Sequence, residues 1–290
     1  MDSNLTYPFF TGGRAKGPTR HRMLAVLSER HPEAFPTLDQ AAAWSELVFV
    51  PPSRRWAFVR NGKAGTTSAL RALFEMEFGV PLTVKVTLPT DINSDAAPHQ
   101  LAAADVFRPL SAFPAGLSAI DGALRLATVR HPASRAVSAF LYLCSTQYAA
   151  HPWFLRERLR INALVGFDWD SDFRTASGFE KFLRYIEDTR AAAGPGSVNP
   201  HWRAQVETVL PEIYRPHLVG KVEHLGDFLT EVAERLGQPL KQGVGTGRAN
   251  ASGASGAADA LLTPTARALV ARIYAKDFET FGYLPDAQSA

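Results

Sequence analysis

Residues 58–68 read FVRNGKAGTTS, in which an apolar segment runs into a lysine between two glycines and then into three hydroxyl residues. Gly62 and Gly65 allow the backbone to turn tightly and to approach an anion closely. The apolar spacing that follows predicts a helix that begins just after Gly65 and ends at Gly79. The positive end of that helix would face the same point as the ammonium of Lys63. We therefore interpret this strand, turn and helix as a phosphate-binding element.

The nucleoside-triphosphate P-loop is the obvious comparison for this segment. It requires a glycine, four residues, Gly-Lys and then Ser or Thr. Here Ala64 follows Lys63 where that pattern places the magnesium-binding hydroxyl, and Ala57 stands where it needs its first glycine. A glycine turn that simply joins a strand to a helix is the alternative for this segment taken alone.

Residues 124–140, LRLATVRHPASRAVSAF, repeat the order of apolar strand, turn and helix. Pro132 favours the first turn of the helix, so the strand would end near Arg130. Open α/β sheets bind ligands at the carboxyl ends of their strands, and Arg130 with Ser138 could clamp a second phosphate. Taken alone, the segment is more typical of a plain strand, turn and helix. Both segments together predict an α/β protein with a P-loop-like three-layer fold, in which helices flank a central, mainly parallel sheet.

The two segments together resemble the sulfotransferase superfamily, most closely the carbohydrate (family-2, membrane-type) sulfotransferase branch. In that family a Lys-x-Gly-Thr-Thr-Ser loop holds the 5′-phosphosulfate end of 3′-phosphoadenosine 5′-phosphosulfate (PAPS), and an Arg-x-Pro segment followed by Ser holds the 3′-phosphate. The cofactor-binding residues that this resemblance implies are Lys63, Ala64, Gly65, Thr66, Thr67, Ser68, Arg130 and Ser138.

The resemblance covers about residues 46–284. Residues 201–205 (HWRAQ) resemble the family's His-Trp-Arg-Pro-Gln segment, and two later segments resemble its late strand and its closing helix. The family usually has proline where this chain has Gly62 and Ala204. The first phosphate loop is therefore expected to be looser here, although neither change removes a ligand-binding group.

The resemblance implies in-line transfer of a sulfuryl group from PAPS to an acceptor hydroxyl, with a carbohydrate or glycolipid as the expected acceptor. Lys63 would stabilise charge on the leaving phosphate. His99, which lies between the two phosphate motifs, is the first candidate for the general base, and His201 is the second. An ordinary histidine on a surface loop is the alternative interpretation of His99.

A glycine-rich segment, residues 243–256, predicts a flexible loop. In sulfotransferases a late loop folds over the 3′-phosphate, which makes Arg248 a further candidate cofactor contact, whereas composition alone indicates a linker. Residues 1–20 are expected to form a flexible N-terminal arm, and residues 21–290 a single domain. Within that domain, residues 145–205 are a candidate acceptor-binding insertion.

The chain has 290 residues, of which 46% are hydrophobic and 20% charged, as in a soluble globular protein. No basic run interleaved with aromatic residues occurs, so we expect no nucleic-acid partner. The eight histidines form no ligand pattern and no metal is expected, while the single Cys144 excludes an internal disulfide. No apolar run approaches the ~20 residues of a membrane span. We therefore expect no transmembrane segment, and a cytoplasmic, bacterial enzyme fits this pattern best.

Two other classes of protein remain open at this point. A P-loop kinase or NTPase would show a magnesium-binding Asp after its second strand, where this chain has Arg130. A nucleotide- or glycan-binding protein without catalysis would keep the phosphate ligands and lack a working base. The sequence leaves the acceptor, the position sulfated and the oligomeric state open.

Overall fold

The computed structural model describes residues 14–84, 96–148, 152, 154–238 and 260–285. Within them, five strands form one sheet in the order β3-β1-β2-β4-β5. The strands are β1 (Val48–Val50), β2 (Trp56–Val59), β3 (Arg108–Pro109), β4 (Leu124–Val129) and β5 (Leu218–Lys221). The helices are α2 (Gly17–Arg30), α3 (Leu38–Ser45), α4 (Thr66–Phe78), α5 (Pro132–Ser145), α6 (Leu155–Val165), α7 (Ala176–Ala193), α8 (Gln205–Val209), α9 (Pro211–Tyr214), α10 (Leu225–Leu236), α12 (Pro264–Ile273) and α13 (Ala275–Phe281).

The centre of the sheet is parallel. Strand β4 pairs in parallel with β2 on one side and with β5 on the other, whereas β1 pairs antiparallel with both β2 and β3. The register places Val59 beside Ala127 and Val129 beside Lys221, so the carboxyl ends of the three parallel strands lie at one edge. The predicted α/β fold is confirmed. The two candidate phosphate-binding segments, which follow β2 and β4, therefore begin at the same edge of the sheet.

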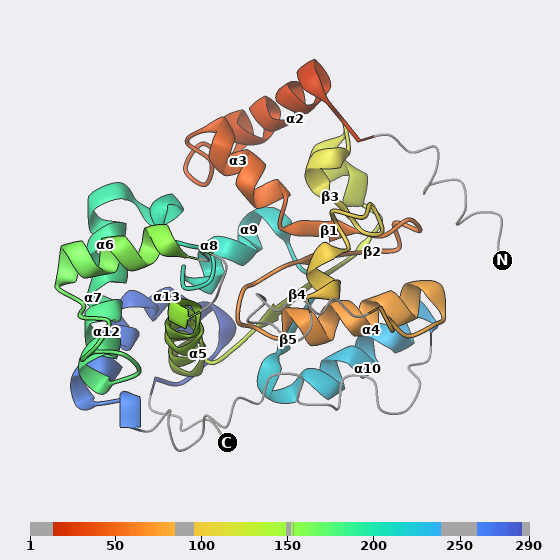
Figure 1. Ribbon diagram of the computed structural model, residues 1–290. Coiled ribbons are helices and arrows are strands. Elements are labelled where there is room, and N and C mark those ends of the chain that lie inside the picture. The colour runs from red at the N-terminus through yellow and green to blue at the C-terminus, as the bar shows by residue number, and fades with distance from the viewer. Residues whose placement is uncertain (1–13, 85–95, 149–151, 153, 239–259, 286–290) are drawn as a thin grey trace.

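Helices cover both faces of the sheet (Figure 1). Helices α2, α3 and α9 cover one face, and α4 and α10 cover the other. Because successive strand residues point to opposite faces, β1, β2 and β4 each contribute to both cores. The sheet residues in the first core are Val48, Val50, Ala57, Val59, Ala127 and Val129, and those in the second include Phe49, Trp56, Phe58 and Leu126.

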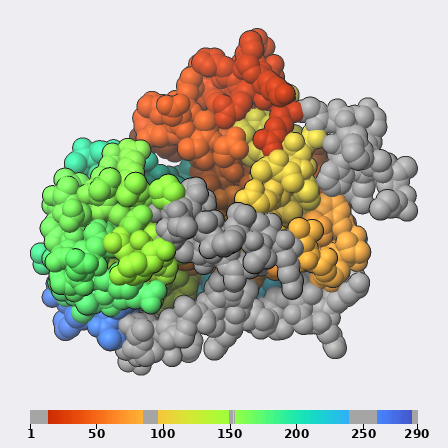
Figure 2. Space-filling model, viewed as in Figure 1, coloured from red at the N-terminus to blue at the C-terminus, as the bar shows by residue number. Residues whose placement is uncertain are grey.

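A third core lies beside the sheet, among α5, α6, α7 and α12. Figure 2 shows its green and blue helices as a lobe next to the part of the molecule that contains α2 and α3. This core is rich in aromatic rings, among them Phe140 of α5 and Phe182 of α7, which also packs against Trp202. Helix α7 is long, with 18 residues. Segment 145–205 thus carries helices α6 and α7.

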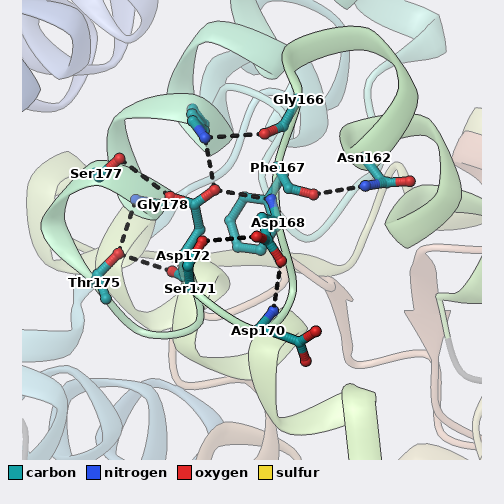
Figure 3. Close-up of polar contacts among 11 residues, drawn as sticks. Asn162, Gly166, Phe167, Asp168, Asp170, Ser171, Asp172, Thr175, Ser177 and Gly178 are labelled. Atoms are coloured by element: carbon teal, nitrogen blue, oxygen red, sulfur yellow. Dashed lines mark hydrogen bonds and ion pairs between the residues drawn. The ribbon is translucent and has the colours of Figure 1, made fainter.

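The turn that joins α6 to α7 is closed by two aspartates (Figure 3). Asp168 accepts from the backbone N–H of Asp170 at 2.9 Å, and Asp172 accepts from the N–H of Asp168 at 2.8 Å. The Lys181 ammonium binds Asp172 Oδ2 at 2.7 Å. Gly178 packs so closely under this turn that a Cβ atom there would lie 2.0 Å from the carbonyl oxygen of Asp172. The turn therefore docks rigidly on the first turn of α7.

Some helix boundaries agree with those predicted from the sequence and others differ. Helix α4 starts at Thr66 and ends before Gly79, which adopts the left-handed φ of 71°, as the pattern predicts. Helix α2 begins at Gly17, inside the range assigned to the N-terminal arm, because Pro18 suits a first turn. Residues 1–13 and the glycine-rich segment 243–256 lie outside the described residues. None of the helices in the described ranges is both long and apolar enough to cross a membrane.

Candidate functional site

The loop after β2 brings Lys63 to the start of α4. Lys63 has a φ of 63° and Gly65 has a φ of 73°, so the loop makes two left-handed steps within three residues. Gly65 is the N-cap of α4, and a Cβ there would lie 3.1 Å from a methyl group of Val222. Since glycine has no capping side chain, no side chain of the N-cap residue occupies the N–H groups of the first helical turn. This turn therefore presents a helix N-terminus without a side-chain cap beside a lysine.

Buried polar side chains hold this loop against β4. The amide of Asn61 donates to the carbonyl of Thr128 and to Oε1 of Gln205, both at 3.0 Å. The hydroxyl of Thr128 donates to the carbonyl of Ala64 at 2.6 Å. The hydroxyl of Thr66 donates to the carbonyl of Asn61 at 2.8 Å. The Thr66 hydroxyl proton thus stabilises the loop.

Arg135 ties the same loop to the segment after residue 199. Its Nε donates to the carbonyl of Gly62 at 2.8 Å, while its two terminal nitrogens donate to the carbonyls of Arg203 at 2.7 Å and Pro200 at 3.2 Å. The side chain is fully buried, and burial lowers its pKa. Here Arg135 is a structural cross-link, a role that the sequence motif did not reveal.

The two departures from the usual family pattern, Gly62 and Ala204, lie in segments that touch each other. A Cβ atom at Gly62 would lie 3.2 Å from the Cα of His201 and 3.3 Å from the carbonyl oxygen of Pro200. Such a contact is tighter than an ordinary van der Waals contact, so a larger residue at position 62 would push the two segments apart. Glycine allows the loop to pack closely and to be held by Arg135, and the loop is therefore tightly packed where a looser one was expected.

Arg130 follows β4 and is fixed through its backbone. Its N–H donates to Oε1 of Gln205 at 2.9 Å, and its carbonyl accepts from Nε2 of Gln205 at 2.8 Å. The backbone N–H of His131 donates to Glu223 at 2.8 Å. Burial lowers the pKa of Arg130, and the nearby Glu223 and Tyr283 raise it by less. The backbone of Arg130 is thus held in a fixed position at the end of β4.

The ammonium of Lys63 lies over an aromatic ring. Its Nζ is 3.9 Å from the centroid of the ring of Tyr142, which belongs to α5. Burial lowers the pKa of Lys63 to about 8, and the charges of Arg130 and Arg135 act in the same direction. Neither Lys63 nor Arg130 forms an ion pair with a carboxylate in the part of the chain that the structure describes. Both cations therefore stay available to an anionic ligand.

His99 reaches the loop from a different part of the chain. It lies in a short 3₁₀ helix, Ala97–Gln100, and its Nε2 is 3.1 Å from Oγ1 of Thr67 in the first turn of α4. This places an imidazole beside that turn.

His201 packs against the face of the Tyr142 ring. The two rings stack with centroids 5.7 Å apart and an interplanar angle of 23°, and Phe154 packs edge-on against both. Nδ1 of His201 is 2.9 Å from Oδ1 of Asn199. Burial lowers the pKa of His201 to about 3, and the charges of Lys63, Arg135, Arg60 and His99 add to this effect. His201 is therefore a neutral ring at physiological pH.

The structure brings together most of the residues singled out in the sequence. The first turn of α4, Lys63, His99 and His201 lie in one region, and Ser138 lies one helical turn before Tyr142 on α5. Arg248 lies outside the described residues. Tyr142 itself was not assigned a role, although its spacing of four residues from Ser138 already placed the two on one helical face. Among the described residues, no group of three or more His, Cys, Asp or Glu could hold a metal ion.

Comparison with known proteins adds independent information. The model of the Sulfotransferase family matches residues 91–284, which is more than half of the chain. The match contains Arg130, His99 and His201, whereas the Lys63 loop precedes it. No curated protein and no solved structure matches the chain. The family match, the α/β fold and the two cations at one sheet edge agree, and the chain belongs to the Sulfotransferase family.

Proposed function

We propose that this sulfotransferase uses PAPS as its donor and transfers the sulfuryl group to a hydroxyl of a carbohydrate or glycolipid. One observation carries the proposal. Lys63, the open N-terminal turn of α4 and Arg130 converge at the carboxyl edge of the parallel strands, and no described carboxylate forms an ion pair with either cation. An arrangement of cations and N–H groups is complementary to a ligand with several phosphate or sulfate groups.

The residues present fit PAPS. Lys63 and the N–H groups of Thr66, Thr67 and Ser68 would hold its 5′-phosphosulfate end, and Arg130 with Ser138 would hold its 3′-phosphate. When bound, PAPS supplies the sulfuryl group and the leaving phosphate. Lys63 and the positive end of α4 stabilise the negative charge that develops on that phosphate, and the fixed loop requires little reorganisation.

The general base in this proposal is His99. Its imidazole lies beside the turn that would hold the phosphosulfate, which puts it near the end of the donor where the transfer would take place. His201 is less suited because a base with a pKa of about 3 attracts a proton only weakly at neutral pH. Glu223 already accepts hydrogen bonds on both oxygens, from His131 N–H and from the Tyr283 hydroxyl. His201 and Glu223 are therefore proposed to support the site.

A calorimetric titration with 3′-phosphoadenosine 5′-phosphate (PAP), the product of PAPS, tests the donor site. We expect PAP to bind and magnesium-ATP to bind more weakly, and Lys63→Ala and Arg130→Ala to weaken PAP binding by roughly tenfold or more each. Lys16→Ala and Arg235→Ala, which remove exposed cations just before α2 and on α10, are the matched controls.

Two results would contradict the proposed donor. A preference for magnesium-ATP, with hydrolysis, would support the kinase or NTPase alternative. Unchanged PAP affinity in both variants would show that Lys63 and Arg130 do not hold the nucleotide. Tight PAP binding, followed by no transfer from PAPS to any member of a glycan and glycolipid panel, would overturn the proposed acceptor class.

A further inference from the structure

The contact between Lys63 and Tyr142 has an unusual chemical setting. An ammonium 3.9 Å from a ring centroid is within the range of a cation–π interaction, in which the negative face of the ring attracts the cation. A mostly buried lysine is more commonly paired with a carboxylate. Here the other charged groups that act on Lys63 are Arg130, after β4, and Arg135 of α5, and both are positive. The ring is thus the attractive partner that the described residues offer to this ammonium.

Pairing the Lys63 ammonium with an aromatic ring, and not with a carboxylate, has a functional consequence. A carboxylate would neutralise Lys63 and would repel an incoming phosphosulfate group. A ring attracts the ammonium without adding negative charge, so the full positive charge of Lys63 stays available to the donor. Tyr142 also lies on the same face of α5 as Ser138, so the ring and a proposed donor contact project from one helix.

The ring of Tyr142 is itself held in place. His201 stacks on it at 5.7 Å, and Phe154 packs edge-on against it, also at 5.7 Å. His201 is fixed in turn by Asn199, whose Oδ1 is 2.9 Å from its Nδ1. A neutral His201 suits this place because a second cation behind the ring would weaken its attraction for Lys63. These contacts give a physical reason for the HWRAQ segment to lie against the phosphate loop.

We propose that Tyr142 is the positioning residue for Lys63, and that its ring face keeps the ammonium charged and directed into the donor site before the donor binds. The inference rests on the proposed role of Lys63 at the phosphosulfate end of PAPS. It assigns His201 and Phe154 to the support of the ring. It also gives Lys63 a defined position in the ligand-free protein, where it would otherwise lie among cations that repel it.

The ligand-free protein allows a direct test. The chain has seven lysines, so a ¹³C- and ¹⁵N-detected NMR titration of the lysine Cε and Nζ groups is tractable, and Lys63→Arg identifies the Lys63 signal. Tyr142→Leu removes the ring face and should lower the pKa of Lys63 by about half a unit to one unit, a three- to tenfold change in the protonation constant. Tyr142→Phe keeps the ring face and should leave that pKa within a few tenths of the wild-type value.

Binding of PAP gives the second readout. Between about pH 7 and about pH 9.5 the affinity should fall as Lys63 loses its proton, and in Tyr142→Leu this fall should begin at lower pH. Tyr148→Leu, which makes the same change at an exposed tyrosine after α5, should behave as the wild type. Thermal melts of all variants would show whether each one folds.

The two measurements separate failure of this inference from failure of the proposed donor. An identical pKa of Lys63 in the wild type, Tyr142→Phe and Tyr142→Leu would overturn the role of Tyr142, whatever nucleotide binds. A pKa shift confined to Tyr142→Leu, in a protein that does not bind PAP, would support the role of the ring and reject the donor. A loss of affinity in Tyr142→Leu that is equal at every pH would indicate a purely structural effect and would also count against the inference.

Discussion

Nε2 of His99 lies 3.1 Å from Oγ1 of Thr67, although 32 residues separate them in the chain. The contact joins the short 3₁₀ helix before β3 to the first turn of α4. It places the only imidazole that contacts this turn, among the described residues, next to the N–H groups that would hold the phosphosulfate. The imidazole of His201, in contrast, is buried behind Tyr142 and contacts Asn199.

The first prediction separates these two histidines. His99→Asn should lower kcat for transfer from PAPS by roughly 100-fold or more, because a positioned general base contributes at least that much. The affinity for PAP should change by less than about twofold, since the cations and N–H groups that would hold PAP stay in place. Steady-state kinetics with an acceptor found in the glycan panel would measure the first quantity, and calorimetry the second. His201→Asn is the comparison, and a loss of kcat as large as that of His99→Asn would contradict the assignment.

The second prediction concerns Arg135. Arg135→Met should lower the free energy of unfolding by about 3 kcal/mol, because the carbonyls of Gly62, Pro200 and Arg203 would lose their buried donors. Chemical denaturation gives this quantity. Arg235→Met removes an arginine whose ion pair with Glu231 is exposed. It should change the free energy of unfolding by no more than about 0.5 kcal/mol. Similar costs for the two substitutions would show that the Arg135 cross-link contributes little.

The third prediction uses a pair of glycines. Gly178→Ala should lower the free energy of unfolding by about 2 kcal/mol or more, because the new Cβ would overlap the carbonyl oxygen of Asp172 and force the turn in Figure 3 off α7. Gly226→Ala in α10 meets no atom within 4 Å and has an ordinary helical environment. It should leave stability unchanged or raise it by about 0.5 kcal/mol. The reverse order in thermal melts would contradict the tight packing at Gly178.

The fourth prediction concerns acid stability. Burial raises the pKa of Asp172, but hydrogen bonds from Lys181, Asp168 and Ser177 lower it by more, so its pKa in the folded protein lies below the ordinary value. A depressed pKa gives stability that is present above the pKa of the unfolded chain and is lost as the pH falls through the folded pKa. Asp172→Asn should therefore flatten the fall in unfolding free energy below about pH 4.

Urea denaturation at several acidic pH values would measure this effect. Asp188→Asn, on the exposed side of α7, is the control, and its pH dependence should match the wild type. An unchanged slope in Asp172→Asn would show that its ion pair with Lys181 contributes no pH-dependent stability.

Local patterns in the chain were sufficient for the two phosphate-binding elements. The glycines around Lys63 and the apolar spacing after them predicted α4 and its end at Gly79, because these features depend on residues close together in the chain. Pro132 predicted the start of α5 for the same reason. The sequence left the antiparallel pairing of β1 with β3 undetermined, since strand pairing between distant segments has no local signal.

The sequence by itself therefore determined the fold class, the loop that carries Lys63 and the family to which the chain is similar. Only the tertiary structure decided how the candidate residues divide their roles. His99 and His201 were both candidates for the general base. In the structure His99 lies beside Thr67, whereas His201 is neutral and stacked on Tyr142. Their difference arises from burial and from neighbouring charges, which depend on which distant segments fold against each other and which no local pattern encodes.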